Sequence, residues 1–146
     1  MELKAKSFTT KFNWQVRELT TMVDISYPAE VQSKRFVAIR DTGATGSCIT
    51  QQIIDELGLK SIGFCNVGGV SGMHRTEKYK IDLVLPNGVY ISGLTVIRCA
   101  SLGVGDVLIG MDIIAKWDLA ISHDELGNML MSFVIPPQWV IDFSIK

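Results

Sequence analysis

The sequence predicts a mostly β protein, a closed barrel or a sandwich of short strands that carries two short helices. Three observations predict this class. Short segments of strand type recur along the chain, turn residues separate them about every 8–12 positions, and only two stretches suit a helix. This combination is typical of small β-barrels and sandwiches.

The first half of the chain supplies two predicted strands and a helix. The stretch 1–18 is weakly patterned, and we expect an N-terminal arm or an edge segment there. Thr20–Ser26 alternates apolar and polar residues, and Phe36–Ile39 is a continuous apolar run, so both are predicted strands. A short helix is expected to follow, with Thr50 as its N-cap and Gly58 just past its end.

A glycine-rich segment and a hairpin come next. Glycines cluster between Gly63 and Gly72, and beyond them Tyr79–Leu85 alternates as a half-buried strand does. Pro86-Asn87-Gly88 predicts a tight turn, because Asn-Gly tolerates the positive φ that hairpins need. Tyr90–Ile97 is the predicted returning strand.

The last third contains a buried strand, a second helix and an apolar tail. Val107–Gly110 reads as a buried strand that leads into a short helix at about Asp112–Trp117. At the end, Trp139, Ile141, Phe143 and Ile145 alternate with polar residues and predict a final strand. We expect residues 19–146 to form a single domain.

Composition excludes several classes of protein. The 146 residues carry 14 basic and 15 acidic side chains, a net charge of -1, and no dense basic block that would indicate nucleic-acid binding. No apolar run approaches the roughly 20 residues of a membrane span, and the N-terminus does not resemble a signal peptide. Three scattered cysteines suit a reducing compartment, so we expect a cytoplasmic protein.

The run Asp41-Thr42-Gly43 is the candidate for chemistry. An apolar strand delivers the Asp41 carboxylate, and the small residues after it let other backbone approach closely at Gly43 and Ala44. Taken alone, the run also suits a polar turn in which Asp41 caps backbone amides. The surrounding residues favour a carboxylate that is held firmly and stays accessible.

Three segments together resemble the retropepsin-like aspartic proteases, the retroviral type and its cellular and bacterial relatives. Residues 41–45, Asp-Thr-Gly-Ala-Thr, resemble their catalytic loop, and Gly68–Gly72 resembles their glycine-rich flap tip. Val107–Gly110, followed by Met111–Ile114, resembles their second signature. The resemblance spans about Thr20 to Trp117 and implies a retropepsin-like closed β-barrel, which is one half of an acid protease.

The resemblance also implies a mechanism and a set of site residues. Two aspartates face each other, share a proton and activate a water that attacks the peptide bond. Asp41 would be the catalytic carboxyl, Thr42 would brace the loop, and Gly43 would offer backbone groups to the substrate. The resemblance places further substrate contacts at Ala44, Gly69, Val70, Ser71, Gly72 and Ile109.

One loop per chain implies a homodimer. A two-lobed aspartic protease carries two such loops in a much longer chain, whereas this chain has one. The second Asp41 must therefore come from another copy across a two-fold axis. In the family, terminal strands from both chains interleave, and the tail 139–145 is the candidate for this role. The alternative is a strand that packs within its own chain.

Three positions depart from the retroviral pattern. Thr45 and Met111 stand where an acidic residue and an arginine are often found, so that potential ion pair is missing as a whole. Arg40 precedes Asp41 where an apolar residue is usual. Since neighbouring strand residues point to opposite faces, Arg40 should face away from the paired carboxyls.

Two other functions remain open. A retropepsin-shaped module could dimerise or bind peptides without cutting them. Residues 41–45 also fit the Asp-x-Gly-x-Thr phosphate loop of actin-like nucleotide binders, although that fold needs two large domains. No metal or cofactor is expected, because two histidines and three scattered cysteines give no ligand spacing.

Overall fold

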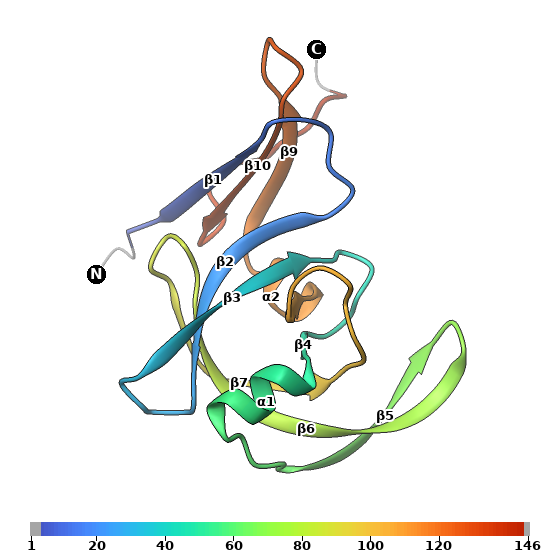
Figure 1. Cartoon of the computed structure of the whole chain (residues 1–146). Coiled ribbons are helices and arrows are strands. Elements are labelled where there is room, and N and C mark those ends of the chain that lie inside the picture. The colour runs from blue at the N-terminus through green and yellow to red at the C-terminus, as the bar shows by residue number, and fades with distance from the viewer. Residues whose placement is uncertain (1–3, 145–146) are drawn as a thin grey trace.

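Two β-sheets make up the body of the protein, whose computed structural model describes residues 4–144 (Figure 1). The larger sheet contains, in spatial order, β2 (Leu19–Ser26), β3 (Ser33–Arg40), β8 (Val107–Ile109), β4 (Cys48–Ile49), β7 (Tyr90–Arg98), β6 (Gly72–Val84) and β5 (Gly63–Gly69). The mostly β class with two short helices is therefore confirmed.

The larger sheet bends back toward its first strand. β2 pairs antiparallel with β3 along its length and also with β6, where Ser26 lies opposite Asp82. The resulting partly closed ring surrounds a core of aliphatic side chains with no exposed surface, among them Ile25, Ile49, Ile53, Ile81, Leu83 and Ile109. Burial of such side chains, each worth about 1.5–3 kcal/mol, holds the ring together.

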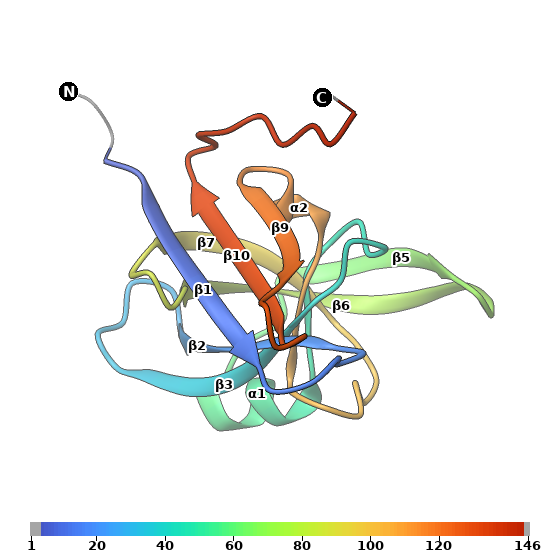
Figure 2. The same cartoon turned by 90° about the horizontal axis from the view of Figure 1, so that it is seen from above.

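A smaller antiparallel sheet lies across one side of the ring (Figure 2). It consists of β1 (Lys6–Phe12), β10 (Met129–Ile135) and β9 (Asp118–His123), with β10 in the middle. The stretch 1–18, expected to be an arm or an edge segment, thus contains an edge strand. Phe8 and Phe133 lie opposite each other in this sheet, with ring centroids 6.0 Å apart.

The two helices are short, as the sequence predicts. The first, α1 (Gln51–Leu57), follows Thr50 and ends at Gly58, whose φ of 62° only glycine adopts readily. The second, α2 (Met111–Ile114), begins one residue earlier than expected and ends before Trp117. Trp117 instead packs in the core, 4.5 Å from the Phe133 ring centroid. No helix in the described range 4–144 has the length and apolar character of a membrane-crossing helix.

The tail does not form the predicted strand within this chain. β10 is the last strand among the described residues, 136–144 follow without regular structure, and Ile145 lies outside the described residues. Pro136 and Pro137 interrupt the pattern because proline lacks the N–H that a strand ladder needs. The first residues of the tail are held by Asp118, whose Oδ2 accepts hydrogen bonds from the backbone N of Gln138 and Trp139 at 2.6 and 2.9 Å.

Candidate active site

Asp41 follows directly on β3, where that strand pairs in parallel with β8. Arg40 lies opposite Ile109, and the backbone N of Asp41 donates to the Ile109 carbonyl at 3.0 Å. Alternation along the strand buries Arg40 and leaves Asp41 half-exposed. Ile109, expected to contact substrate, is completely buried, so within one chain it supports Asp41 through its carbonyl.

The loop Asp41–Ser47, called the Asp41 loop below, orients the carboxylate. Gly43 N donates to Asp41 Oδ1 at 2.8 Å, and Ala44 N donates to the Asp41 carbonyl at 3.3 Å. Within residues 4–144, Asp41 Oδ2 has no hydrogen-bond partner in the protein. One carboxylate oxygen is therefore fixed by the loop, and the other is available.

The Asp41 loop rests on the residues that open α2. Met111 N donates to the Ala44 carbonyl at 2.8 Å and Asp112 N to the Thr45 carbonyl at 3.1 Å. Gly110 allows this approach, because a Cβ there would lie 2.6 Å from the Gly46 carbonyl oxygen. The two segments that carry the family resemblance at residues 41–45 and 107–114 thus lie in direct contact.

Asp112 closes the same loop at its far end. Its Oδ2 accepts from Ser47 N at 3.1 Å and its Oδ1 accepts from Ser47 Oγ at 2.8 Å. Ser47 Oγ in turn accepts from Gly110 N at 3.1 Å. Ser47 is buried, so these bonds satisfy polar groups that water does not reach. Local sequence pattern does not indicate this contact, because Ser47 and Asp112 are 65 residues apart.

Arg40 points into the space between the two sheets. Its guanidinium lies over the rings of Trp117 and Phe133, 5.5 and 4.9 Å from their centroids, and donates through Nη1 to Thr21 Oγ1. Burial lowers the pKa of Arg40 to about 10. Its Nε and Nη2 have no hydrogen-bond partner among the described residues. The aromatic faces therefore provide much of its electrostatic stabilisation.

A cleft of about 750 Å³ opens beside the Asp41 loop. Its walls come from the Asp41 loop, the β5–β6 hairpin and β7, and we call it the loop cleft. Gly43 and Ala44 line it, as does Val67, which lies opposite His74 on the hairpin. The β7 wall was not predicted from the sequence, although alternation along the predicted strand Tyr90–Ile97 places Thr95 and Ile97 on one face.

The β5–β6 hairpin, called the flap below, projects away from the body (Figure 1). Gly69 pairs with Gly72, and Val70 and Ser71 form the turn between them. All four residues are exposed, and Gly72 has a φ of 103° that suits glycine. These four expected substrate contacts do not line the loop cleft in the single chain; only the flap closer to its base does.

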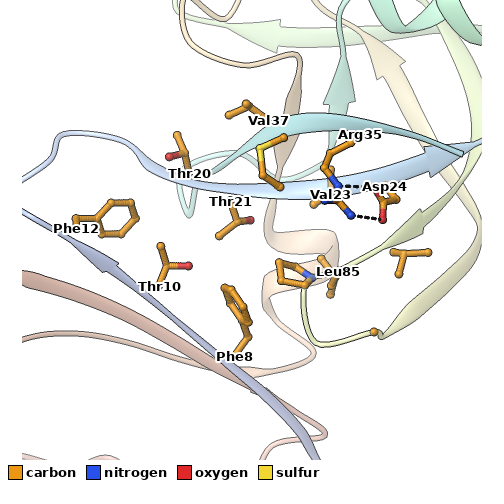
Figure 3. Close-up of a pocket in the computed structure, with 14 residues that line it drawn as sticks. Phe8, Thr10, Phe12, Thr20, Thr21, Val23, Asp24, Arg35, Val37 and Leu85 are labelled. Carbon is orange, nitrogen blue, oxygen red and sulfur yellow. Dashed lines mark hydrogen bonds and ion pairs between the residues drawn. The ribbon is translucent and has the colours of Figure 1, made fainter.

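A second groove, of about 700 Å³, lies elsewhere and contains none of the expected site residues. In Figure 3, Phe8, Thr10 and Phe12 of β1 face Thr21 and Leu85 across this groove. An ion pair between Arg35 Nε and Asp24 Oδ1, 2.9 Å apart, also borders the groove. This groove supports no function in catalysis, because the carboxylate that lines it, Asp24, is held in the ion pair with Arg35.

The described residues offer no metal site. Within residues 4–144 no group of three or more His, Cys, Asp or Glu side chains could hold a metal ion.

Comparisons with known proteins agree with this geometry. The sequence profile of the family described as "gag-polyprotein putative aspartyl protease" matches residues 27–116, a range that holds the Asp41 loop, the flap and Gly110. A search of curated proteins finds no match.

Two solved structures show the same fold. The EIAV protease in complex with the inhibitor HBY-793 superposes with a TM-score of 0.56 at 20% identity, over 73% of this chain and 92% of that one. A retropepsin-like aspartic protease from Rickettsia conorii gives 0.55 at 12% identity, over 92% and 97%. The chain has the retropepsin-like fold and belongs to the gag-polyprotein aspartyl protease family.

Proposed function

We propose that the protein is an aspartic endopeptidase that hydrolyses peptide bonds as a homodimer, with Asp41 of each chain as the catalytic carboxyl. One observation carries the proposal. Asp41 is anchored through Oδ1 at 2.8 Å from Gly43 N, keeps Oδ2 free within residues 4–144, and belongs to a loop whose next residues, Gly43 and Ala44, line a cleft of about 750 Å³. Such a cleft has the size of a site for a few peptide residues.

The chemistry follows from two such carboxyls close together. Because two like charges a few ångström apart are unfavourable, one carboxyl is protonated and the other is ionised. The ionised carboxylate takes a proton from a water molecule, which attacks the peptide carbonyl carbon, while the protonated carboxyl donates to the carbonyl oxygen. Collapse of the tetrahedral intermediate then breaks the C–N bond after the amine nitrogen has been protonated.

The single chain supplies half of this arrangement. Thr42, Gly43, Thr45 and Gly46 are exposed, although the backbone beneath them is firmly bonded to the start of α2. An exposed but rigid loop of small residues suits contact with the same loop of a second copy across a two-fold axis. In this arrangement Thr42 braces the paired loops and Gly43 offers its backbone to the substrate, with Ala44 and the flap tip Gly69–Gly72 as further contacts.

The test compares wild type with Asp41→Asn on an unstructured protein substrate. Asparagine keeps an oxygen that can accept from Gly43 N but supplies no carboxyl, so the fold persists and activity falls about 10²–10⁴-fold. Asp55→Asn, which changes an exposed carboxylate on α1, is the matched control and stays active. Equal cleavage by wild type and Asp41→Asn would mean that a contaminant cuts the substrate, and no cleavage by either would favour a module that binds peptides without cutting them.

A mixing experiment tests the shared site. Adding excess Asp41→Asn chain to a fixed amount of wild type should lower the activity, because wild-type chains enter mixed dimers with one carboxyl. Activity should also disappear on dilution below the dimer dissociation constant. Activity that is proportional to wild-type concentration under both conditions would show that one chain suffices.

The apolar tail is the candidate for stabilising the dimer. Val140 and Phe143 are 91% and 94% exposed, and Trp139 is 67% exposed. Exposure of several large apolar side chains to water is unfavourable in a monomer and is typical of a binding surface. Deleting residues 139–146 should give an inactive monomer that keeps its β structure, as measured by sedimentation and circular dichroism. A truncated chain that sediments as an active dimer would move the interface to the Asp41 loop alone.

A further inference from the structure

Cys48 and Cys99 form a pair of thiols in the wall of the loop cleft. Cys48 belongs to β4 and lies opposite Ile97 of β7, and Cys99 follows directly after β7, two residues beyond Ile97. The backbone N of Cys99 donates to the Ile49 carbonyl at 2.9 Å, and its Sγ lies 3.4 Å from the same oxygen. Both cysteines line the cleft.

The two thiols differ in exposure and in ionisation. Cys48 is buried, whereas Cys99 is half-buried and reachable from the cleft. The Cys48 thiol, which can donate to a neighbouring thiolate, lowers the pKa of Cys99 against the effect of burial. Cys99 in turn raises the pKa of Cys48, with burial and the charges of Asp41 and Asp112 acting in the same direction.

These differences assign different roles to the two sulfurs. The more accessible thiol with the lowered pKa is the better source of thiolate at neutral pH, and thiolate is the nucleophile in disulfide exchange. The buried thiol beside it is placed to attack a mixed disulfide once one has formed. Gly43 and Ala44 line the same cleft as both cysteines, so the pair lies near the loop that carries the proposed catalytic carboxyl.

We propose that Cys48 and Cys99 are a redox modification site in the loop cleft that reacts with low-molecular-weight disulfides such as oxidised glutathione. The Cys99 thiolate attacks one sulfur of the disulfide, whose S–S bond breaks, and the first thiol leaves after taking up a proton. The Cys48 thiolate then attacks Cys99 Sγ and expels the second thiol. The two cysteines are oxidised by loss of two hydrogens, and the small disulfide is reduced to two thiols.

The structure suggests why this oxidation would stop peptide cleavage, a consequence that rests on the proposed function. A mixed disulfide on Cys99 occupies the cleft. Cys48 lies opposite Ile97 and not opposite Cys99, so an internal disulfide, which requires Cα atoms about 4.4–6.8 Å apart, draws β4 toward the residue that follows β7. Cys48 directly follows Ser47, whose bonds to Asp112 at 3.1 and 2.8 Å close the Asp41 loop. Movement of β4 therefore displaces the end of the loop.

The experiment treats the full-length protein with oxidised glutathione and follows its mass, its disulfide map and its peptidase activity. The expected product has lost two hydrogens and yields a crosslinked pair of peptides that contain Cys48 and Cys99. Cys99→Ser blocks this product, and Cys48→Ser accumulates one glutathione on Cys99. Cys65→Ser is the matched control, because Cys65 lies on β5 opposite Thr76, and this variant should crosslink as the wild type does.

The outcomes separate this proposal from the proposed function. Activity should fall in proportion to the crosslinked fraction and return with dithiothreitol, each variant being compared with its own untreated sample. A wild type that gains glutathione on Cys65 alone, or shows no crosslink between Cys48 and Cys99, overturns the modification site. Crosslinking without any loss of activity overturns the regulatory consequence. A wild type without peptidase activity in either state overturns the proposed function and leaves the mass result valid.

Discussion

The Asp41 loop and the flap tip are both exposed turns of small residues, yet they are held in different ways. The Asp41 loop is bonded along its length to the start of α2, through Ala44, Thr45 and Ser47. The flap tip has only the pairing of Gly69 with Gly72 within its own hairpin. Glycine therefore serves two purposes: it lets backbone segments approach closely at the Asp41 loop, and it gives the flap tip a turn that packs against nothing outside its hairpin.

The largest expected effect tests the packing beneath the Asp41 loop. Gly110→Ala places a Cβ 2.6 Å from the Gly46 carbonyl oxygen and 2.9 Å from that of Ala44, so the loop must shift. We expect a loss of about 1–3 kcal/mol in the free energy of unfolding, with activity reduced about 10²-fold or more by misplacement of Asp41. Urea denaturation and peptidase assays measure the two effects.

The matched control for Gly110 is Gly46 in the same loop. A Cβ at Gly46 meets no atom within 4 Å, and its φ lies outside the range that favours glycine. Gly46→Ala should therefore leave stability within about 0.5 kcal/mol of wild type. Equal destabilisation by the two substitutions would show that the loop responds to any added side chain and that contact with Gly110 is not the reason.

The next effect tests Asp112, which we regard as a positioning residue for the Asp41 loop. Asp112→Ala leaves the backbone N and hydroxyl of buried Ser47 without their acceptor, at a cost of about 1–3 kcal/mol. Asp112→Asn keeps one acceptor oxygen and should therefore lower the free energy of unfolding by less than Asp112→Ala does. Ser47→Ala should lower the free energy of unfolding less in the Asp112→Ala protein than in the wild type. Equal losses in the two proteins would show that the two residues do not act as a pair.

A smaller effect on stability is expected at the end of β6 away from the flap tip, which is buried whereas the tip is exposed. Asp82 on β6 is buried, and although burial raises its pKa, hydrogen bonds from Tyr90 Oη, Gly93 N and Ala29 N lower it overall. Its ionised form therefore stabilises the fold above the unfolded pKa of about 3.9, and this contribution is lost as the pH falls through the folded pKa.

Asp82→Asn should be less stable than wild type by about 1–3 kcal/mol at neutral pH, because a buried backbone amide loses its acceptor. The difference should narrow as the pH falls below 4, as the wild type loses its ionised carboxylate. Denaturation at several pH values measures this trend. A constant difference across the acid range would mean that the charge of Asp82 does not contribute.

The smallest expected effect on stability is at the flap tip. A Cβ at Gly69 meets no atom within 4 Å, so Gly69→Ala should change stability by no more than about 0.5 kcal/mol. Amides at the tip should exchange hydrogen much faster than those of Met111 and Asp112, and a peptide-like inhibitor should slow them. Full protection of the tip in the free protein would show that the tip is held as firmly as the Asp41 loop.

Local sequence pattern was sufficient for much of the ring. Alternation and apolar runs predicted the strands observed as β2, β3, β6, β7 and β8, and Thr50 and Gly58 marked the two ends of α1. The Thr50 hydroxyl does not cap the helix, because it donates to Asp106 Oδ1. Local sequence pattern failed where strand formation depends on a pairing partner far along the sequence. β1 has few apolar residues and exists because β10 pairs with it, and the tail alternates like a strand but has no partner within the chain. Strand formation depends on such partners more than on intrinsic preference.

The sequence by itself determined the chemical identity of the site: one Asp-Thr-Gly run at the end of an apolar strand, a distant glycine turn and a late glycine before a helix. Only the tertiary structure decided how these segments meet. It paired Ser47 with Asp112, buried Ile109 beneath Asp41 and brought Cys48 and Cys99 into the wall of one cleft. Side-chain contacts between segments 50 or more residues apart depend on strand register and sheet closure, which local periodicity does not encode.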